Sequence, residues 1–248
     1  MTVPAFHDVA IVTGAAGGLG AVISKRLCQE GFRVVMTDVD EVGLESAARA
    51  IEGQVITAIL DVRDPASFEH VVQLAIGKWG GVGVLVNNAA LTKTTPLFEI
   101  SPEEFDAVTA IALKGTFIGC QVLGRHMRSN EYGRIINMAS LAAQNGGAAT
   151  GAHYAAAKGG IVTLTKVFAR ELAADGVCIN AISPGPLDLD SVRALLPAEK
   201  LEAVTKSIPA GVLGDPDYIA KMVVLLADPN AVSAVGATFD INGGLYLR

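Results

Sequence analysis

The sequence predicts one α/β domain, in which a parallel sheet is covered by helices on both faces. Two observations lead to this fold. Short apolar runs rich in β-branched residues alternate with longer segments whose apolar residues recur every three or four positions. No linker, low-complexity run or repeat interrupts the alternation over the 248 residues. We therefore predict a single doubly wound domain over residues 1–248, with seven strands in one parallel sheet.

The alternation also sets the expected elements. The run Val9-Ala10-Ile11-Val12-Thr13 is typical of a buried strand, and Ile23 and Leu27 then follow at helical spacing. The predicted strands are 8–13, 32–37, 54–60, 83–87, 133–138, 177–182 and 235–241, and the predicted helices are 18–30, 41–51, 65–79, 103–129, 153–174, 190–205 and 215–227. Ligands of such sheets bind at the carboxyl ends of the strands, so the residues that follow each strand are the functional candidates.

The loop after the first strand is rich in glycine. Its candidate residues are Gly14, Gly17, Gly18, Leu19 and Gly20, between the strand and the helix. Without side chains the backbone can approach a pyrophosphate closely, and the helix N-terminus offers free N–H groups and a favourable dipole. Glycines also form ordinary turns, but this strand and helix context favours a dinucleotide site of the Rossmann type.

Asp38 follows the second strand, where an acid accepts hydrogen bonds from the adenosine ribose hydroxyls and repels a 2′-phosphate. No basic residue stands between Ala15 and Gly18. These features predict NAD rather than NADP as the cofactor. Asp40 and Glu41 follow closely, so a solvated loop acid is the alternative.

The later strand ends supply the rest of the predicted site. Asp61 and Val62 follow the third strand and are expected to flank the adenine, and Asn88 follows the fourth. Ser140 follows the fifth strand, and Pro184 and Gly185 follow the sixth. Cofactor and substrate should meet in the cleft that these strand ends share.

Tyr154 and Lys158 are one turn apart on a predicted helix and share a face. A nearby ammonium favours the phenolate, so we expect Lys158 to lower the pKa of Tyr154 and make it an acid or base near neutral pH. Ser140 could hold the substrate oxygen. A helix with one tyrosine and one surface lysine is the alternative. The neighbouring His153 should point about 100° away and not act directly.

Together these motifs resemble the short-chain dehydrogenase/reductase family, in its compact group of chains near this length. The family's Thr-Gly-x-x-x-Gly-x-Gly turn falls on Thr13, Gly14, Gly18 and Gly20. Its Asn-Asn-Ala-Gly segment falls on 87–90, with alanine at the last position. Its catalytic triad falls on Ser140, Tyr154 and Lys158, and its Pro-Gly segment on Pro184 and Gly185. The resemblance implies that Tyr154 is the acid/base, that Ser140 orients the substrate oxygen, and that Lys158 binds the nicotinamide ribose.

The chain departs from the family's pattern at two further places. The family's asparagine, which holds a water in the proton relay, should stand at Ala112, whose side chain cannot hydrogen-bond. A threonine that contacts the nicotinamide carboxamide is replaced by Leu189, which leaves open how the amide is held. Leu187 completes the predicted cofactor contacts. The spacing of Gly14, Gly17 and Gly20 also resembles longer sugar-nucleotide epimerases, but little chain follows Pro184.

Composition excludes several classes of function. The formal charge is −6 with a pI of about 5.2, and no basic stripe is present, so nucleic acid and anionic membranes are poor partners. Three widely spaced cysteines indicate reduced thiols, no Cys/His spacing indicates a metal, and no secretory signal is visible. We therefore expect a cytoplasmic protein without a metal.

The substrate pocket is expected to be lined by residues 91–96, 141–150 and 186–208, the last resembling the family's substrate lid. Apolar lid residues predict a mainly apolar substrate; they are Val192, Leu195, Leu196, Leu201 and Val204. The basic residues there could contact an anionic substrate group, although a solvated surface is favoured; they are Lys93, Arg193, Lys200 and Lys206.

Three functions remain open. The first is an NAD(H)-dependent alcohol dehydrogenase or ketone reductase for a small, mainly apolar secondary alcohol, cyclic alcohols included. The second is a 3-oxoacyl-thioester (acyl carrier protein) reductase, against which Asp38 argues because many such enzymes prefer NADPH. The third is a non-catalytic NAD-binding sensor or scaffold, which only Ala112 supports. The resemblance also implies a homotetramer, and helices 103–129 and 153–174 carry apolar residues on more than one side.

Overall fold

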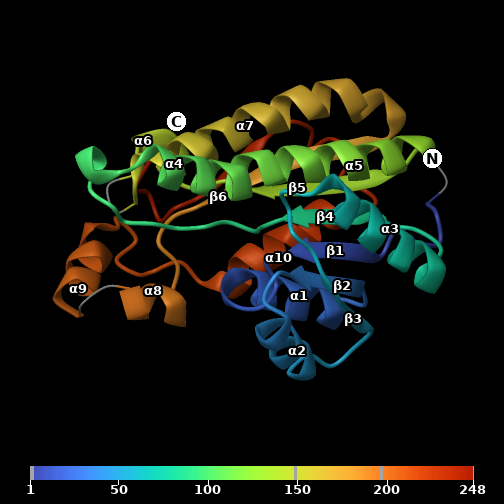
Figure 1. Cartoon of the computed structure of the whole chain (residues 1–248), viewed down its shortest axis with the longest axis horizontal. Coiled ribbons are helices and arrows are strands. Elements are labelled where there is room, and N and C mark those ends of the chain that lie inside the picture. Colours follow the sequence, from blue (N-terminus) through green and yellow to red (C-terminus); the bar gives the residue numbers. More distant parts are fainter. Residues whose placement is uncertain (1–2, 148–149, 196–197, 248) are drawn as a thin grey trace.

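The computed structural model describes residues 3–147, 150–195 and 198–247. Its centre is a parallel sheet of seven strands, as predicted (Figure 1). The strands stand in the order β3-β2-β1-β4-β5-β6-β7. The strands are β1 Val9–Thr13, β2 Arg33–Asp38, β3 Val55–Ile59, β4 Val84–Asn87, β5 Gly133–Met138, β6 Val177–Pro184 and β7 Thr238–Ile241. The order reverses between β1 and β4, and this reversal is the point at which doubly wound sheets bind their ligands.

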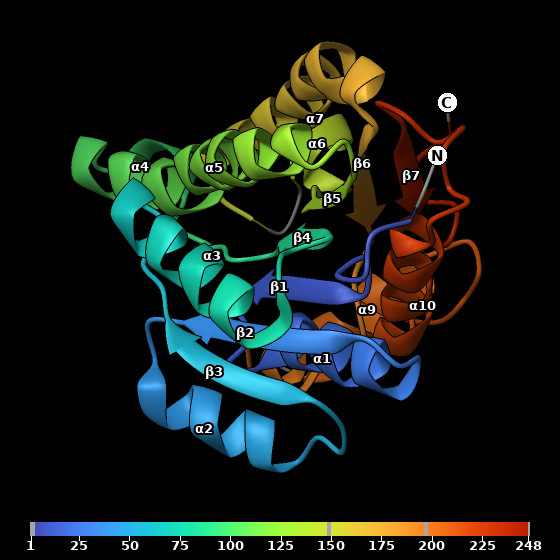
Figure 2. The ribbon, with the colours of Figure 1, turned by 90° about the vertical axis from the view of Figure 1, so that its right-hand side faces the viewer.

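Helices cover both faces of the sheet. They are α1 Gly18–Gln29, α2 Glu41–Arg49, α3 Pro65–Trp79, α4 Pro102–Thr109, α5 Gly115–Ser129, α6 Ala142–Asn145, α7 Ala152–Leu172, α8 Asp190–Leu195, α9 Ala198–Ser207 and α10 Pro216–Ala227. Figure 2 shows α3, α5 and α7 on one face, with α1, α2 and α10 on the other. The sequence predicts this arrangement, with helices on both faces of the sheet.

Three of the helices begin at a polar residue followed by proline. The pairs are Asp64-Pro65, Ser101-Pro102 and Asp215-Pro216, which start α3, α4 and α10. In each pair the first side chain accepts a hydrogen bond from a backbone N–H of the first turn, and the proline occupies a position whose N–H has no helical partner. The local sequence therefore fixes where these helices start.

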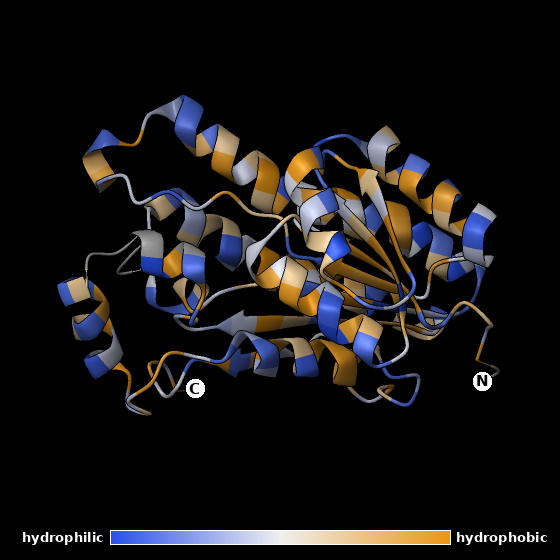
Figure 3. Ribbon diagram, turned by 90° about the horizontal axis from the view of Figure 1, so that it is seen from below, coloured by the Kyte–Doolittle hydropathy of each residue, from blue (hydrophilic) through white to orange (hydrophobic). Residues whose placement is uncertain are grey.

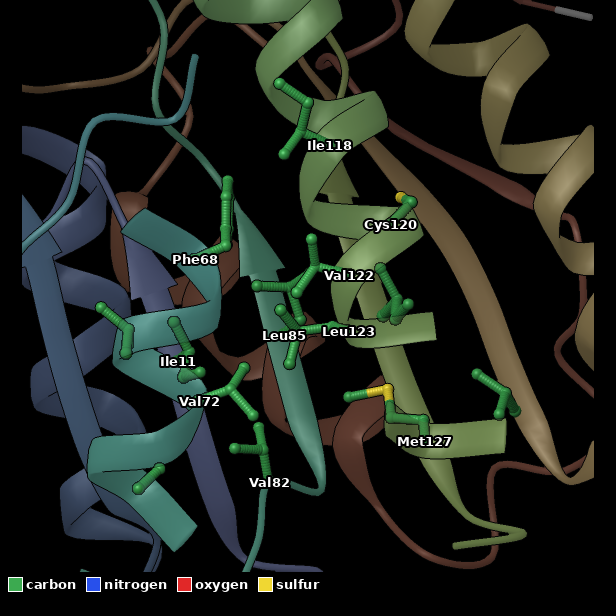
Figure 4. Close-up of a cluster of buried hydrophobic side chains, with 14 of the residues drawn as sticks. Ile11, Phe68, Val72, Val82, Leu85, Ile118, Cys120, Val122, Leu123 and Met127 are labelled. Carbon is green, nitrogen blue, oxygen red and sulfur yellow. The ribbon is translucent and has the colours of Figure 1, made fainter. Parts of the chain in front are cut away.

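A separate hydrophobic core lies under each helical layer. In the first, Phe68 and Val72 of α3 pack with Leu85 of β4 and with Leu123 and Met127 of α5 (Figure 4). Burial of a side chain such as Phe68 stabilises the fold by roughly 1.5–3 kcal/mol. Coloured by hydropathy, the strands are mainly apolar, whereas the helices alternate between apolar and polar residues (Figure 3). A sheet buried on both faces accounts for this pattern.

The structure corrects several predicted boundaries. The predicted helix 103–129 is interrupted by a π-helical turn, Ala110–Lys114, that separates α4 from α5. The predicted helix 190–205 is two helices, α8 and α9, and the predicted strand 235–241 is shortened to β7. Short 3₁₀ turns at Leu97–Glu99 and Ala173–Asp175 and the short helix α6 were not predicted. Apolar periodicity continues through such interruptions, so it cannot locate them.

The stretch Pro102–Ser129 is long and apolar enough to cross a bilayer by length and composition alone. In its most apolar window, 56% is buried inside the protein. Val122, Leu123 and Met127 of this stretch belong to the first core. Packing inside the domain accounts for its apolar character.

Candidate active site

The glycine turn joins β1 to α1 and leaves no room for side chains at two positions. Gly14 has a φ of +66°, and a Cβ there would lie 2.8 Å from the Cα of Ala89. A Cβ on Gly20 would lie 2.1 Å from the carbonyl oxygen of Gly14. Around Gly17, by contrast, a Cβ would meet nothing within 4 Å. The turn therefore excludes side chains at Gly14 and Gly20, whereas the space around Gly17, at the start of α1, is open.

No side chain caps α1 at Gly17, and its first turn contains no acid. The N–H groups and the positive dipole end at this helix start are suited to a phosphate. The observed cradle fits a dinucleotide pyrophosphate, which Gly17, Gly18 and Leu19 would hold, as the sequence predicts.

Asn88 braces this turn from the end of β4. Its Nδ2 donates hydrogen bonds to the carbonyl oxygens of Thr13 at 3.0 Å and Gly14 at 3.1 Å. The Thr13 hydroxyl in turn accepts from the backbone N–H groups of Asn88 and Ala89 at 3.0 and 3.1 Å. Asn88 therefore acts on the predicted cofactor site by holding the glycine turn in place.

Asp38 ends β2 beside the same turn. Its Oδ2 accepts a hydrogen bond from the backbone N–H of Ala16 at 3.1 Å, and its Oδ1 accepts from Val39 at 2.8 Å. Asp40, the alternative acid, is the N-cap of α2, and its Oδ1 accepts a hydrogen bond from the backbone N–H of Gly43. The carboxylate next to the glycine turn is thus Asp38, and its position fits a ribose diol.

Asp61 and Val62 lie beyond β3. Asp61 forms an ion pair with Arg63 at 2.6 Å. Hydrogen bonds from the Arg63 side chain hold the pKa of the Asp61 carboxyl below its usual range. Val62 is 7% exposed and packs against the start of α5, where a Cβ on Gly115 would lie 2.7 Å from Val62 Cγ2. This pairing with Arg63 was not predicted, and it engages the carboxylate that was expected to flank the adenine.

The phenol of Tyr154 lies at the meeting point of three segments. Tyr154 is in the first turn of α7, and its hydroxyl forms hydrogen bonds with Ser140, after β5, and with Thr92, after β4. Ser140 Oγ also accepts from the backbone N–H of Ala142 at 3.1 Å, which leaves its proton available for the phenol or a substrate oxygen. The predicted pair of Ser140 and Tyr154 is therefore in contact.

Thr92 is a site residue that the sequence did not single out. It belongs to segment 91–96, which was expected only to line the pocket. Its position after the fourth strand, near the strand ends that carry Asn88 and Ser140, could have indicated that Thr92 belongs to the site.

Lys158 lies one turn beyond Tyr154 and is 3% exposed. Its Nζ donates to the carbonyl oxygen of Met138 at 2.5 Å and lies 5.5 Å from the centre of the Tyr154 ring. Burial lowers the pKa of Lys158 to about 8. This buried ammonium rules out the alternative of a solvated surface lysine.

The expected direction of the Tyr154 pKa is corrected by the structure. Burial raises the pKa of the Tyr154 phenol, while hydrogen bonds with Ser140 and Thr92 lower it to a smaller extent. Desolvation penalises the phenolate more than these neighbours stabilise it. In the protein alone the phenol is therefore protonated at neutral pH, the form that donates a proton.

Ala112 lies at the centre of the π-helical turn and is fully buried. Its carbonyl oxygen accepts a hydrogen bond from Thr116 Oγ1 at 2.8 Å. The turn packs on α7, where a Cβ on Gly160 would lie 2.7 Å from Leu113 Cδ1. Irregular helical turns of this kind occur often at functional sites.

Gly185 and Leu187 follow β6 at the edge of the site. A Cβ on Gly185 would lie 2.9 Å from Asn242 Cα, so the glycine permits a close backbone approach. Leu187 is 7% exposed and pairs with Gly214 in an isolated parallel bridge. This bridge anchors the base of the predicted lid, from which α8 and α9 extend (Figure 1).

Two of the four basic residues considered for substrate binding are paired with acids. Arg193 forms an ion pair with Asp188 at 2.7 Å, and Lys206 forms one with Glu202 at 2.6 Å. These pairs agree with the solvated-surface alternative. Among the apolar lid residues, Val192, Leu201 and Val204 are half-buried, Leu196 lies outside the described residues, and the side chain of Leu195 is not described.

A Rossmann-type sheet, a glycine cradle with Asp38 beside it, and a Ser-Tyr-Lys group whose lysine is buried define an oxidoreductase site. Comparison with known proteins agrees. A family model described as "Enoyl-(Acyl carrier protein) reductase" matches residues 14–246. The chain belongs to the short-chain dehydrogenase/reductase family, and it is an oxidoreductase of the kind that acts on CH–OH groups.

Its relatives include proteins with different substrates. The chain is 37% identical over 239 residues to the 3-oxoacyl-[acyl-carrier-protein] reductase of Vibrio cholerae, covering 96% of this chain and 97% of that protein. It is 34% identical over 249 residues to the sorbitol dehydrogenase of Cereibacter sphaeroides, with the same coverage of 96% and 97%. The crystal structure of levodione reductase superimposes with a TM-score of 0.91 at 30% identity, covering 97% of this chain and 98% of that one.

Proposed function

We propose that the chain interconverts a small, mainly apolar secondary alcohol and its ketone, with NAD(H) as the cofactor. The observation that supports this most directly is the contact of the Tyr154 phenol with the hydroxyls of Ser140 and Thr92, one helical turn before the buried Lys158. These groups can bind an oxygen and move a proton to or from it.

The chain's own residues have separate roles in this reaction. The Ser140 hydroxyl donates a hydrogen bond to the substrate oxygen and orients it beside Tyr154. In ketone reduction Tyr154 donates its proton to that oxygen; in alcohol oxidation the phenolate accepts the proton. A bound nicotinamide supplies or accepts the hydride at the substrate carbon. Lys158 lies where it could hold the nicotinamide ribose, as the resemblance implies.

NAD(H) is proposed because Asp38 stands beside the glycine turn, with its carboxylate held by the backbone N–H groups of Ala16 and Val39. A 2′-phosphate approaching this carboxylate would meet a like charge and no cation from residues 15–18. The glycines Gly14, Gly17, Gly18 and Gly20, with Leu19, Asn88, Pro184, Gly185 and Leu187, complete the proposed cofactor contacts, and Asp61 and Val62 are proposed at the adenine.

A 3-oxoacyl-[acyl-carrier-protein] reductase is the second candidate, and the identity with the Vibrio cholerae enzyme favours it. One screen separates the candidates. Purified protein is offered secondary alcohols, ketones and a 3-oxoacyl thioester, each with NAD(H) and NADP(H), while absorbance of the reduced cofactor is followed. Turnover of ketones with NADH supports the proposal, and efficient turnover only of the thioester with NADPH supports the second candidate. No turnover with any pair would indicate a cofactor sensor or scaffold.

We also propose a homotetramer in the cytoplasm, without nucleic acid, membrane or metal partners. Cys28, Cys120 and Cys178 are all buried free thiols, which suits a reducing compartment. Among the described residues no group of three metal-ligating side chains is found. The apolar outer face of α4, α5 and α7 is the proposed contact between subunits.

A further inference from the structure

His153 connects the catalytic tyrosine to a distant carboxylate. The His153 side chain is completely buried, although it is directly next to Tyr154 in the chain. Its Nε2 lies 3.0 Å from Glu104 Oε1, and its Nδ1 accepts a hydrogen bond from the backbone N–H of Tyr154 at 2.8 Å. These contacts are consistent with the expectation that His153 does not act directly in catalysis. They connect its ring instead to Glu104 and to the backbone of Tyr154.

The two contacts define the protonation of the ring. Because Nδ1 accepts a backbone N–H, it carries no proton, and Nε2–H is the donor to Glu104. The Glu104 carboxylate also accepts a hydrogen bond from Thr95, and these two donors together hold the pKa of Glu104 below its usual range. His153 therefore links the Glu104 carboxylate to the first turn of α7.

Glu104 is itself fixed in place. It lies in the first turn of α4, where its backbone N–H donates to the side chain of Ser101, the N-cap residue, at 3.1 Å. Through Thr95 the carboxylate also holds the segment that follows β4. One carboxylate thus joins α4, segment 91–96 and α7.

A second set of contacts joins the same segment to the start of α7. The backbone N–H of Gly151 donates to the carbonyl oxygen of Lys93 at 2.9 Å, and the Thr92 hydroxyl contacts the Tyr154 phenol. A Cβ on Gly151 would lie 2.3 Å from His153 Cε1, so the ring occupies the space above this glycine. Segment 91–96 and the first turn of α7 therefore form one braced unit around the phenol.

We propose that Glu104 and His153 are a positioning pair for Tyr154, which holds the start of α7 so that the phenol stays against Ser140 and Thr92. This inference rests on the proposed function, because it assigns these residues to the acid/base step. Neither residue touches a reacting atom. Misplacement of a reacting group by about 1 Å can cost about a hundredfold in rate, so loss of the pair should lower kcat and leave cofactor binding unchanged.

The test compares variants that remove one contact at a time. His153→Asn keeps an acceptor near the position of Nδ1, and His153→Gln keeps a donor near the position of Nε2. His153→Ala and Glu104→Ala remove the pair, Glu104→Gln keeps an acceptor for Nε2–H, and Glu103→Ala is the matched control on the exposed neighbour. We measure kcat, the Kd for NADH, thermal unfolding and the ultraviolet titration of the phenol, with Tyr154→Phe subtracted.

For the two alanine variants we expect kcat to fall between about tenfold and a hundredfold, with the Kd for NADH within twofold of the wild type. The Tyr154 titration should move towards the ordinary tyrosine value as water reaches the phenol. Glu104→Gln and Glu103→Ala should behave like the wild type, and His153→Asn and His153→Gln should lie between.

The phenol titration keeps this test separate from the proposed function, since it needs no substrate. If the wild type turns over no substrate, the proposed function fails, but a shifted titration in both alanine variants still supports the positioning pair. An unchanged titration in folded His153→Ala and Glu104→Ala overturns the positioning pair, whether or not the enzyme is active. The positioning pair is also overturned if kcat falls only in variants whose unfolding temperature is lowered.

Discussion

The Lys158 ammonium donates a hydrogen bond to the carbonyl oxygen of Met138 at 2.5 Å and is held there by α7 packing on the end of β5. A charged group in this buried place is costly, because one carbonyl dipole replaces its hydration shell. That cost lowers the pKa of Lys158 to about 8. The site therefore keeps a group that works against the stability of the fold.

Lys158→Met should raise the free energy of unfolding of the cofactor-free protein. The folded protein releases the Lys158 proton at about pH 8, and the unfolded chain releases it at the ordinary value of 10.5. Below pH 8 both states carry the charge, and its burial costs about 3 kcal/mol, taking 1.36 kcal/mol for each pKa unit. The gain in the variant should be near this value at pH 7 and fall as pH rises from 8 to 10.5.

Urea unfolding of wild type and variant at several pH values measures this difference. Lys114→Met, at an exposed position in the π-helical turn, is the control and should show no such pH-dependent gain. A Lys158→Met variant that is less stable at pH 7 would show that the bond to Met138 outweighs desolvation.

Tyr154→Phe should abolish turnover while NADH still binds. The phenol is the proton donor of the group formed with Ser140 and Thr92, and its removal hardly changes the shape of the side chain. General acid/base catalysis typically contributes about 10²–10⁴-fold, so kcat should fall by at least about a hundredfold. Steady-state rates and NADH fluorescence titration measure the two effects.

Tyr132→Phe is the matched control for this substitution. The Tyr132 hydroxyl is buried with no hydrogen-bond partner among the described residues, so its removal should leave kcat unchanged. Retention of more than about a hundredth of kcat by Tyr154→Phe would contradict acid/base catalysis at this residue.

The fold and most of the strand-end residues could be predicted because they depend on local patterns. The glycine turn, Asp38 and Asn88 each follow a strand, and parallel strands bring their carboxyl ends to one edge of the sheet. That single topological rule gathers residues such as Gly14 and Tyr154, which are far apart in the sequence.

The parts that were missed depend on tertiary contacts. The contacts of His153 with Glu104 and of Tyr154 with Thr92 join different elements, and their residues have no shared motif. The raised pKa of Tyr154 follows from burial, which depends on everything packed around the phenol. The π-helical turn at Ala112 lies within a continuous helical pattern, so periodicity concealed it.

Asp38→Asn should narrow the preference for NAD(H). The wild type should favour NAD(H) by at least about tenfold in kcat/KM, equivalent to about 1.4 kcal/mol. The two Asp38 oxygens accept separately from the backbone N–H groups of Ala16 and Val39. Asparagine keeps an acceptor for one of these groups and removes the charge that repels a 2′-phosphate. Comparison of kcat/KM for both cofactors measures the change.

Asp40→Asn is the control for charge near the same loop, since Asp40 caps α2. It should change the preference little. Equal use of the two cofactors by the wild type would contradict the assignment of Asp38.

Val167→Asp should disrupt the proposed tetramer. Val167 is 46% exposed on α7. Phe117 of α5 is 39% exposed, and its ring lies tilted against Phe168 with the ring centres 5.8 Å apart. Leu113 and Leu164 line an apolar groove on the same face. Such a face on several helices is typical of a buried interface, so a charge there should yield smaller species in light scattering.

Val42→Asp is the control for an added charge, because Val42 is 81% exposed on α2, on the other helical layer. It should leave the molar mass unchanged. A wild type that is monomeric at micromolar concentration would contradict the proposed assembly.

Ala112→Asn tests the absent relay residue. Ala112 is completely buried, so the larger side chain must displace its neighbours, which typically costs about 1–3 kcal/mol of stability. The π-helical turn packs on α7, and the added amide would lie beside that helix. We expect an unchanged Kd for NADH and a kcat equal to or above that of the wild type.

Ala112→Leu separates the chemistry of the added amide from its shape, because leucine has the same number and branching of side-chain heavy atoms but no hydrogen-bonding atoms. If the amide joins the proton relay, Ala112→Asn should be clearly faster than Ala112→Leu, while both lose similar stability in urea. If both folded variants lose kcat to the same extent, the small residue is required by the shape of the substrate pocket. In that case Ala112 determines which substrate fits, and the proton of Tyr154 reaches solvent by a route that needs no side chain at this position.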